Sequence, residues 1–259
     1  MTINERKRAI LAKESYNVYD LCEIVKILRS PEGCPWDKVQ THQTIRKDLL
    51  EEVYEVMEAI DCDDPAMLRE ELGDVLLQVL FHCDIEADKG NFTLDEAADE
   101  VCKKLILRHP HVFGDVQADT VDKVLTNWDA IKKDEKHQES YTDTMNSVPK
   151  VFPALMRAQK LTKRASRAGV DFETTNEVIG LIREKLDELQ SGKSSPEEIG
   201  DLLLLCAELS RLSGVDAEEL LGYECDDFIK RFEALETSGR LTDASARELY
   251  YKAEDNTED

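Results

Sequence analysis

The sequence predicts an all-α protein that contains two tandem helical domains, and two observations support this. First, apolar residues recur at helical spacing along most of the chain, and the alternating pattern of β-strands is nearly absent. Second, REELGDVLLQVLFH (69–82) and PEEIGDLLLLCAEL (196–209) align without a gap, and each follows an acidic helical segment and a short polar loop. This repeat is far too long for a solenoid, so it indicates two copies of one helical domain.

The composition limits the class of protein. The 259 residues are 41% hydrophobic and 34% charged, which is typical of a globular chain with substantial cores. The net charge of −23 disfavours broad binding to nucleic acid or to an anionic membrane, and it fits cation binding or a solubilising surface. No apolar run approaches the roughly 20 residues of a membrane helix.

The cysteines and the first residues suggest the compartment. There are seven cysteines and no C-x-x-C pair, so neither a disulfide framework nor a zinc knuckle is indicated. The segment MTINERKRAILAKE is basic but lacks the apolar stretch of a signal peptide. We therefore expect reduced thiols and a cytoplasmic protein.

The first copy is expected over residues 15–137. A first helix carries an apolar stripe from Leu21 to Leu28, and a second follows Thr41. Asp64 and Pro65 mark the start of a third helix. The faces expected to point inward are Leu49, Val53, Val56, Met57 and Ile60 on the second helix, and Leu72, Val75, Leu76, Val79 and Leu80 on the third. Thr93-x-x-Glu96 predicts a capping box for a fourth helix that Pro110 ends, and 119–136 suggests a fifth.

The second copy is expected over residues 150–238, after a polar linker at 138–149. Its clearest helix start is Ser195-Pro196-Glu197-Glu198, which combines an N-cap serine, a proline at the first helical position and a glutamate at the third. Residues 239–259 form an acidic tail.

Two pairs of acids lie beside the apolar stripes of the second and third helices. Glu52 and Glu55 share a helix face, as do Glu71 and Asp74. The short loop between these helices favours an antiparallel hairpin in which the pairs converge. Paired glutamates are usually a solvated face, but four converging carboxylates repel one another unless a cation lies between them. Their oxygens suit Mg²⁺ or Mn²⁺.

Magnesium held by carboxylates points to phosphoryl transfer or phosphoanhydride hydrolysis. Neither the P-loop nor the G-x-G-x-x-G motif occurs, so cationic side chains must hold the phosphates. The candidates are Arg46, Lys47, Lys103, Lys104 and Arg108, although the last three also suit a helix C-terminus. Trp36 is a candidate for base stacking or a core anchor. His109-x-His111 has no further ligand at zinc spacing, so we expect no zinc site.

Three blocks resemble the MazG family of nucleoside triphosphate pyrophosphohydrolases. They are CPWDKVQTHQTIRKDLLEEVYEVMEAI (34–60), REELGDVLLQVLFH (69–82) and KKLILRHPHVFGDV (103–116), and MRAQKLTKRASRAGVDF (156–172) extends the resemblance to the second copy. The resemblance implies tandem domains of four-helix-bundle type in a homodimer. It also implies Mg²⁺-dependent hydrolysis of NTPs and dNTPs to the monophosphate and pyrophosphate, with water attacking the α-phosphorus.

The resemblance also assigns roles to residues. It implies that Glu52, Glu55, Glu71 and Asp74 bind the metal. It makes Glu51 an outer-sphere partner or the base for the attacking water, with Glu55 as the other candidate base.

The second copy departs from the family pattern. Lys185 stands at the position of the first ligand, followed by Glu188, Glu198 and Asp201. A lysine among three carboxylates is expected to form an ion pair in place of the metal. We therefore expect catalysis in the first copy and a degenerate second copy with a dimerisation or regulatory role.

Two other functions remain open at this point. One is a narrower pyrophosphohydrolase of the same fold, specific for dUTP or phosphoribosyl-ATP, which the two copies and RHPHVF disfavour. The other is a non-catalytic nucleotide or metal sensor, which Lys185 favours for the second copy and the four intact acids disfavour for the first.

Overall fold

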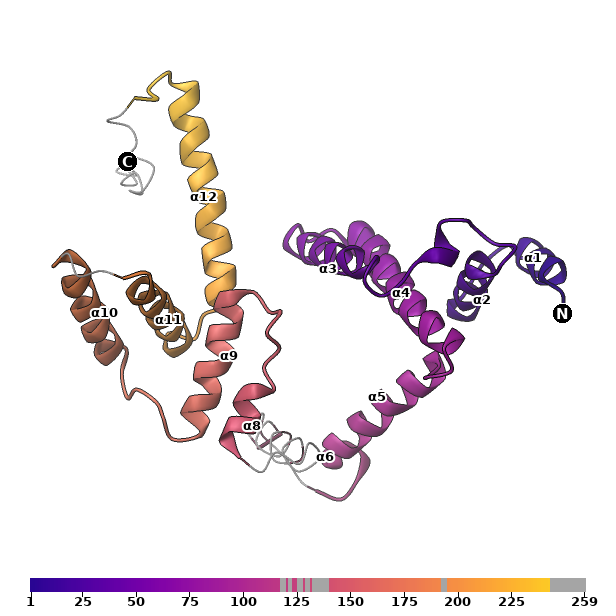
Figure 1. Cartoon of the computed structure of the whole chain (residues 1–259), viewed down its shortest axis with the longest axis horizontal. Helices are drawn as coiled ribbons and strands as arrows, with labels where there is room; N and C mark the ends of the chain where they lie inside the picture. The colour runs from indigo at the N-terminus through magenta and orange to yellow at the C-terminus, as the bar shows by residue number, and fades with distance from the viewer. Residues whose placement is uncertain are drawn as a thin grey trace. The chain divides into compact units, whose positions relative to one another are not determined.

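The computed structural model describes residues 1–116, 120, 123–124, 128, 131, 140–191 and 195–242, and these residues contain no strand. The all-α prediction is therefore confirmed (Figure 1). The chain divides into two compact units, residues 1–132 and 133–259, which are described separately below. No helix in the described ranges has the length and hydrophobicity needed to cross a bilayer.

The first unit is a series of helices, most of them joined by short turns; the longer stretch 30–45 joins α2 to α3. They are α1 (Ile3–Leu11), α2 (Val18–Arg29), the 3₁₀ turn η1 (Asp37–Val39), α3 (Arg46–Asp61), α4 (Pro65–Asp88), α5 (Leu94–Arg108) and α6 (Pro110–Phe113). The starts of α4 and α5 follow the expected signals. Asp64 accepts from the amides of Ala66 and Met67, and Thr93 and Glu96 form the capping box.

The hairpin of α3 and α4 is the main feature of this unit. Its turn is tight, and Asp63 takes the left-handed conformation there, with φ of 50°. The core lies toward the C-terminal half of α4, where Val25, Ile45, Leu80, Phe81 and Ile85 pack together. Burying these side chains holds α2, the start of α3 and α4 to one another.

The other half of the hairpin is less covered than the sequence suggested. Val53, Met57, Ile60 and Leu72 were expected to face the core, but they are 39%, 51%, 58% and 51% exposed. The helical periodicity located the apolar face correctly. It did not reveal that no other described part of the unit covers that face.

The second unit contains α8 (Tyr141–Asn146), α9 (Ala154–Arg167), α10 (Thr175–Gln190), α11 (Pro196–Leu212) and α12 (Ala217–Thr237). Helices α10 and α11 pack as a hairpin, and α9 packs against α8, α11 and α12. The stretch expected as a linker, 138–149, is structured from residue 140. Ser140 caps α8, and Val148 is only 2% exposed.

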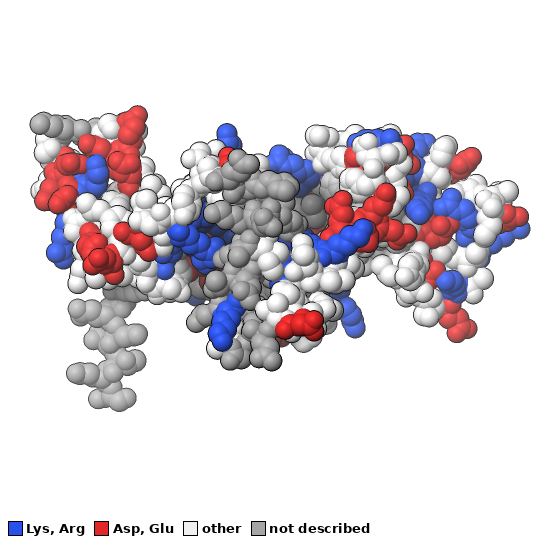
Figure 2. Space-filling view, turned by 90° about the horizontal axis from the view of Figure 1, so that it is seen from below, with Lys and Arg blue, Asp and Glu red and all other residues white. Residues whose placement is uncertain are grey.

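Two other sequence predictions need comment. The N-terminal helix α1 was not expected, although Thr2 and Glu5 form a capping box that starts it. Most of the stretch expected as a fifth helix, 119–136, and most of the acidic tail at 239–259 lie outside the described residues. On the face shown in Figure 2, acidic side chains are interspersed with Lys and Arg rather than gathered in one block.

Candidate metal and nucleotide site

The α3–α4 hairpin brings three glutamates together. Glu52 and Glu55 extend from α3 and Glu71 from α4, and one carboxylate oxygen of each lies within 4.8 Å of the other two. All three side chains are partly buried. The fourth expected acid, Asp74, lies one turn beyond Glu71 on α4 and is not part of this group of three.

The electrostatics of this cluster are unfavourable in the absence of a cation. Burial raises the pKa of Glu52, and the negative charges of Asp74 and Glu55 raise it further. The pKa of Glu71 is raised by burial and then by Glu55 and Glu70. The chain therefore holds like charges close together in a partly desolvated place, which is typical of a site that binds a cation.

A surface depression of about 340 Å³ lies beside the cluster on α3. Its lining includes Lys47, Glu51, Tyr54 and Glu55. Lys47 and Glu51 are four residues apart and therefore lie on one face of the helix. A candidate cation, a candidate base and a carboxylate of the cluster thus border the same hollow.

The other candidate phosphate-binding residues are placed differently. Lys104 and Arg108 lie on α5, which runs away from the α3–α4 hairpin (Figure 1). Arg108 is 6% exposed and its guanidinium lies over the ring of Trp128, 5.4 Å from the centroid. Lys103 pairs with Asp99 at the surface. The structure does not bring these three side chains to the carboxylates.

The remaining candidates precede the cluster along the chain. Trp36 is 58% exposed in the loop before η1, so it is not a core anchor. Arg46 is an exposed residue in the first turn of α3.

The second unit presents the matching hairpin with different contacts. Lys185 Nζ lies 3.0 Å from an oxygen of Glu188 and 3.6 Å from one of Asp201. The hydrogen bond to Glu188 raises the pKa of Lys185. Glu198, three residues into its helix, accepts the backbone N–H of Ser195 at 2.9 Å. Its counterpart Glu71 lies well inside α4, away from any cap.

One polar network was not expected from the sequence. His42, in the segment before α3, contacts both His82 and Glu86 on α4. The spacing of His82 and Glu86 places them on one helix face, but nothing in the sequence near His42 indicates its partner.

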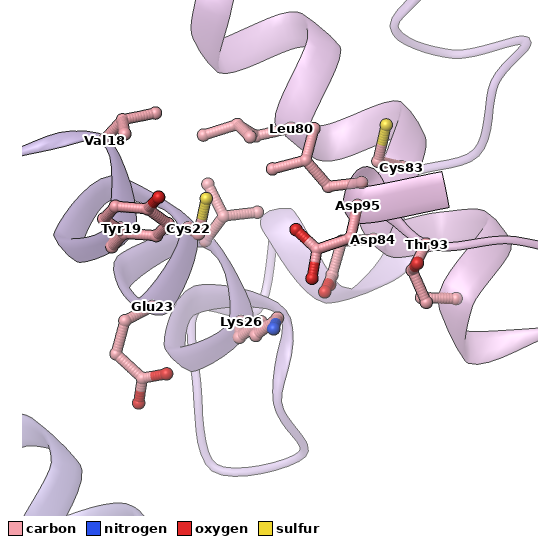
Figure 3. Close-up of a pocket in the computed structure, with 13 residues that line it drawn as sticks. Val18, Tyr19, Cys22, Glu23, Lys26, Leu80, Cys83, Asp84, Thr93 and Asp95 are labelled. Carbon is pink, nitrogen blue, oxygen red and sulfur yellow. The ribbon is translucent and has the colours of Figure 1, made fainter. Parts of the chain in front are cut away.

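A separate pocket of about 360 Å³ lies between α2, α4 and the start of α5 (Figure 3). Val25 and Leu80 of the core contribute to its lining, and the thiols of Cys22 and Cys83 border it. Burial raises the pKa of both thiols, so they are poor nucleophiles. None of the candidate site residues lines this pocket.

An all-helical chain with a carboxylate cluster on a helical hairpin is a candidate metal-dependent phosphohydrolase, and comparison with known proteins agrees. Residues 40–113 match the model of the MazG nucleotide pyrophosphohydrolase domain, and this stretch includes the whole cluster. Because a relative 40% identical over more than four fifths of the chain carries the same family name, the chain belongs to the MazG family.

Relatives extend the similarity beyond this domain. The nucleoside triphosphate pyrophosphohydrolase/pyrophosphatase MazG of Thermotoga maritima is 40% identical over 220 residues, covering 84% of each chain. The nucleoside triphosphate pyrophosphohydrolase of Escherichia coli K12 is 39% identical, covering 83% of this chain and 86% of that protein. The uncharacterized protein YabN of Bacillus subtilis is 41% identical over 84% of this chain and 46% of its own length.

Proposed function

We propose that this protein hydrolyses nucleoside triphosphates to the monophosphate and pyrophosphate, in a reaction that requires Mg²⁺ or Mn²⁺. The observation that carries this proposal is the cluster of Glu52, Glu55 and Glu71 within the segment that matches the family domain. The names of the relatives from Thermotoga maritima and Escherichia coli support the reaction.

The cluster fits a hard divalent cation. Its oxygens lie within 4.8 Å of one another, and opposite ligands of a six-coordinate Mg²⁺ are separated by about 4.2 Å, twice a bond of about 2.1 Å. A small side-chain adjustment therefore suffices for Glu52, Glu55 and Glu71 to bind it, with Asp74 as the fourth ligand. The metal, when bound, neutralises phosphate charge and favours attack by water on the α-phosphorus.

Residues of α3 and the preceding loop supply the other functions in this proposal. Lys47 binds the phosphates at the edge of the hollow that Glu51 and Glu55 also line. Glu51 accepts a proton from the attacking water, a role for which Glu55 is the alternative. Exposed Trp36 stacks on the base, and Arg46 contributes a second positive charge.

The two units divide their roles. The first unit, with all four acids, is catalytic. In the second unit the ammonium group of Lys185 occupies the space between Glu188 and Asp201, and Glu198 is engaged at the helix cap. We infer that this hairpin binds no metal and serves assembly or regulation.

We also propose a homodimer. The apolar face of α3 is exposed at Val53, Met57 and Ile60, and α4 continues it with Leu72. A row of large apolar side chains at this exposure on adjacent helices is a surface that another protein covers. A second copy of the hairpin is complementary to it and completes a four-helix arrangement.

The experiment is pyrophosphate release from a panel of NTPs and dNTPs with Mg²⁺. Glu55→Gln removes a ligand without changing the size of the side chain, and Glu188→Gln is the matched control in the second unit. Loss of activity in Glu55→Gln alone supports the proposal. Loss in Glu188→Gln alone reverses the assignment of the units, and an inactive wild type favours a nucleotide sensor.

A further inference from the structure

A hydrogen-bonded set of three side chains joins the segment before α3 to the C-terminal half of α4. His42 Nδ1 lies 2.7 Å from His82 Nδ1, and His42 Nε2 lies 2.5 Å from a carboxylate oxygen of Glu86. The two imidazole rings are nearly parallel, at 14°. We call His42, His82 and Glu86 the histidine clamp.

Glu86 is the anchored end of the clamp. Its carboxylate also accepts from Lys89 Nζ at 2.6 Å and from Asn91 Nδ2 at 2.7 Å. Lys89, His42 and Asn91 together lower the pKa of Glu86 to about 2. Glu86 is therefore ionised at neutral pH and takes the proton of His42 Nε2 as a hydrogen bond. An imidazole that donates at Nε2 can accept at Nδ1, and the atom facing Nδ1 of His42 is Nδ1 of His82.

His82 is held in its neutral form. Its pKa is lowered, chiefly by burial. Its Nε2 is buried without a hydrogen-bond partner in the described part of the chain, so a proton there would leave an N–H unpaired. The neutral ring donates to His42, and the bond directions along the clamp are thereby fixed.

The clamp matters because α3 lacks a side-chain cap. Its N-cap residue is Ile45, whose side chain is 2% exposed in the core and offers no hydrogen bond to the helix amides. His42 is three residues before Ile45, so it connects the start of α3 directly to α4. The tight turn with Asp63 holds the opposite end of the hairpin.

The clamp lies in line with the carboxylate cluster. Residues seven and eleven positions apart on a helix return to within about 20° of one face, so Glu71, Gln78 and His82 form one row on α4. His82 is about 16 Å along the axis from Glu71. Helix α3 runs along this row. The contacts of His42 fix the position of α3 along the axis of α4, and that position determines where Glu52 and Glu55 meet Glu71.

We propose that the histidine clamp is a positioning device that sets the register of α3 against α4 and thereby the spacing of the metal ligands. This inference rests on the proposed function of the cluster. A slip of one residue along the axis would move the α3 carboxylates by about 1.5 Å, and Mg²⁺ tolerates little departure from octahedral geometry.

The test is Mn²⁺ binding to the full chain, measured by electron paramagnetic resonance. His42→Phe keeps a flat ring but makes neither hydrogen bond. His42→Gln keeps one donor and one acceptor, so it can contact both Glu86 and His82. We expect His42→Phe to raise the Kd for Mn²⁺ severalfold, less than the roughly 10–100-fold loss on removing a direct partner of a metal ligand, and His42→Gln to restore most of the affinity.

Two further measurements keep the result interpretable. Circular dichroism establishes that each variant is folded, and His82→Phe provides a second way to break the clamp, with the same expected loss. Wild-type affinity in a folded His42→Phe or His82→Phe protein overturns the clamp alone. A wild type that binds no Mn²⁺ overturns the proposed function, and the clamp's role with it.

Discussion

At the scale of single residues, the two hairpins differ most at one aligned position. Glu52 in the first unit is a carboxylate whose pKa is raised by burial and by neighbouring acids. Lys185 in the second unit pairs with Glu188 and Asp201. The first hairpin therefore holds like charges that an external cation would neutralise, and the second carries a cation within its own sequence. The aligned repeat made this contrast predictable, because both positions can be read from the sequence.

This contrast predicts a gain of metal binding. Lys185→Glu, made in a Glu55→Gln background, is expected to bind Mn²⁺ in the second unit, because three carboxylates then converge without an ammonium group. The affinity should be modest because Glu198 is engaged with Ser195. Electron paramagnetic resonance measures the bound Mn²⁺. Lys185→Gln, which removes the charge without adding a ligand, is the control, and equal binding by both variants would contradict the prediction.

Glu86 gives a prediction for pH. A carboxylate whose pKa falls from 4.5 to about 2 on folding stabilises the protein fully above 4.5, and this contribution is lost as pH falls toward 2. Glu86→Gln should therefore lower Tm at neutral pH, and the difference from wild type should shrink at pH values below 4.5. Thermal unfolding followed by circular dichroism tests this. A difference that is constant with pH would assign the effect to packing instead.

At the scale of elements, the sequence predicted where helices start better than it predicted which helix faces are buried. Asp64, Thr93 and Ser195 begin helices where expected, because capping depends on residues three or four apart. Burial depends on which helix faces which. Met57 was expected to face the core, but it is exposed because no other described part of the unit packs against it.

In the candidate site, too, local spacing was predictable from the sequence and contacts between distant segments were not. The convergence of Glu52, Glu55 and Glu71 followed from helical spacing and a short loop, and the structure brings their oxygens within 4.8 Å. Arg108 was a candidate for phosphate from its charge, but the structure buries it against Trp128. Contacts between distant segments, such as His42 with Glu86, have no local signal in the sequence.

The loop after α2 contains a glycine that its fold requires. A Cβ at Gly33 would lie 2.2 Å from the carbonyl oxygen of Leu28 and 2.3 Å from that of Ile27. Gly33→Ala must therefore displace backbone, and we expect it to destabilise the first unit by about 1–3 kcal/mol. Gly73→Ala is the control, since nothing lies within 4 Å of its Cβ and alanine favours the helix. Urea unfolding measures both, and equal effects would refute the argument from close contact.

At the scale of the whole molecule, each unit leaves the equivalent face of its hairpin exposed. Val53 aligns with Leu186, and Leu72 aligns with Ile199. Val53 is 39% exposed and its counterpart Leu186 is 48% exposed. Leu72 is 51% exposed and its counterpart Ile199 is 53% exposed. A chain that repeats the same uncovered apolar face in both copies is suited to an assembly in which hairpins pair, with the carboxylate cluster close to that surface.

Pairing of hairpins predicts that one charge on α3 will dissociate the assembly. Met57→Glu places a carboxylate in the middle of the exposed apolar face, and burying it against a second copy would cost several kcal/mol unless it is paired. We expect the variant to sediment as a monomer in analytical ultracentrifugation and the wild type as a dimer. Val170→Glu is the matched control, because Val170 is 72% exposed but lies outside the hairpins. If Met57→Glu sediments like wild type, the α3 face is not the dimer interface. If it is monomeric and also loses Mn²⁺ affinity, the interface supports the geometry of the carboxylate cluster as well as holding the subunits together.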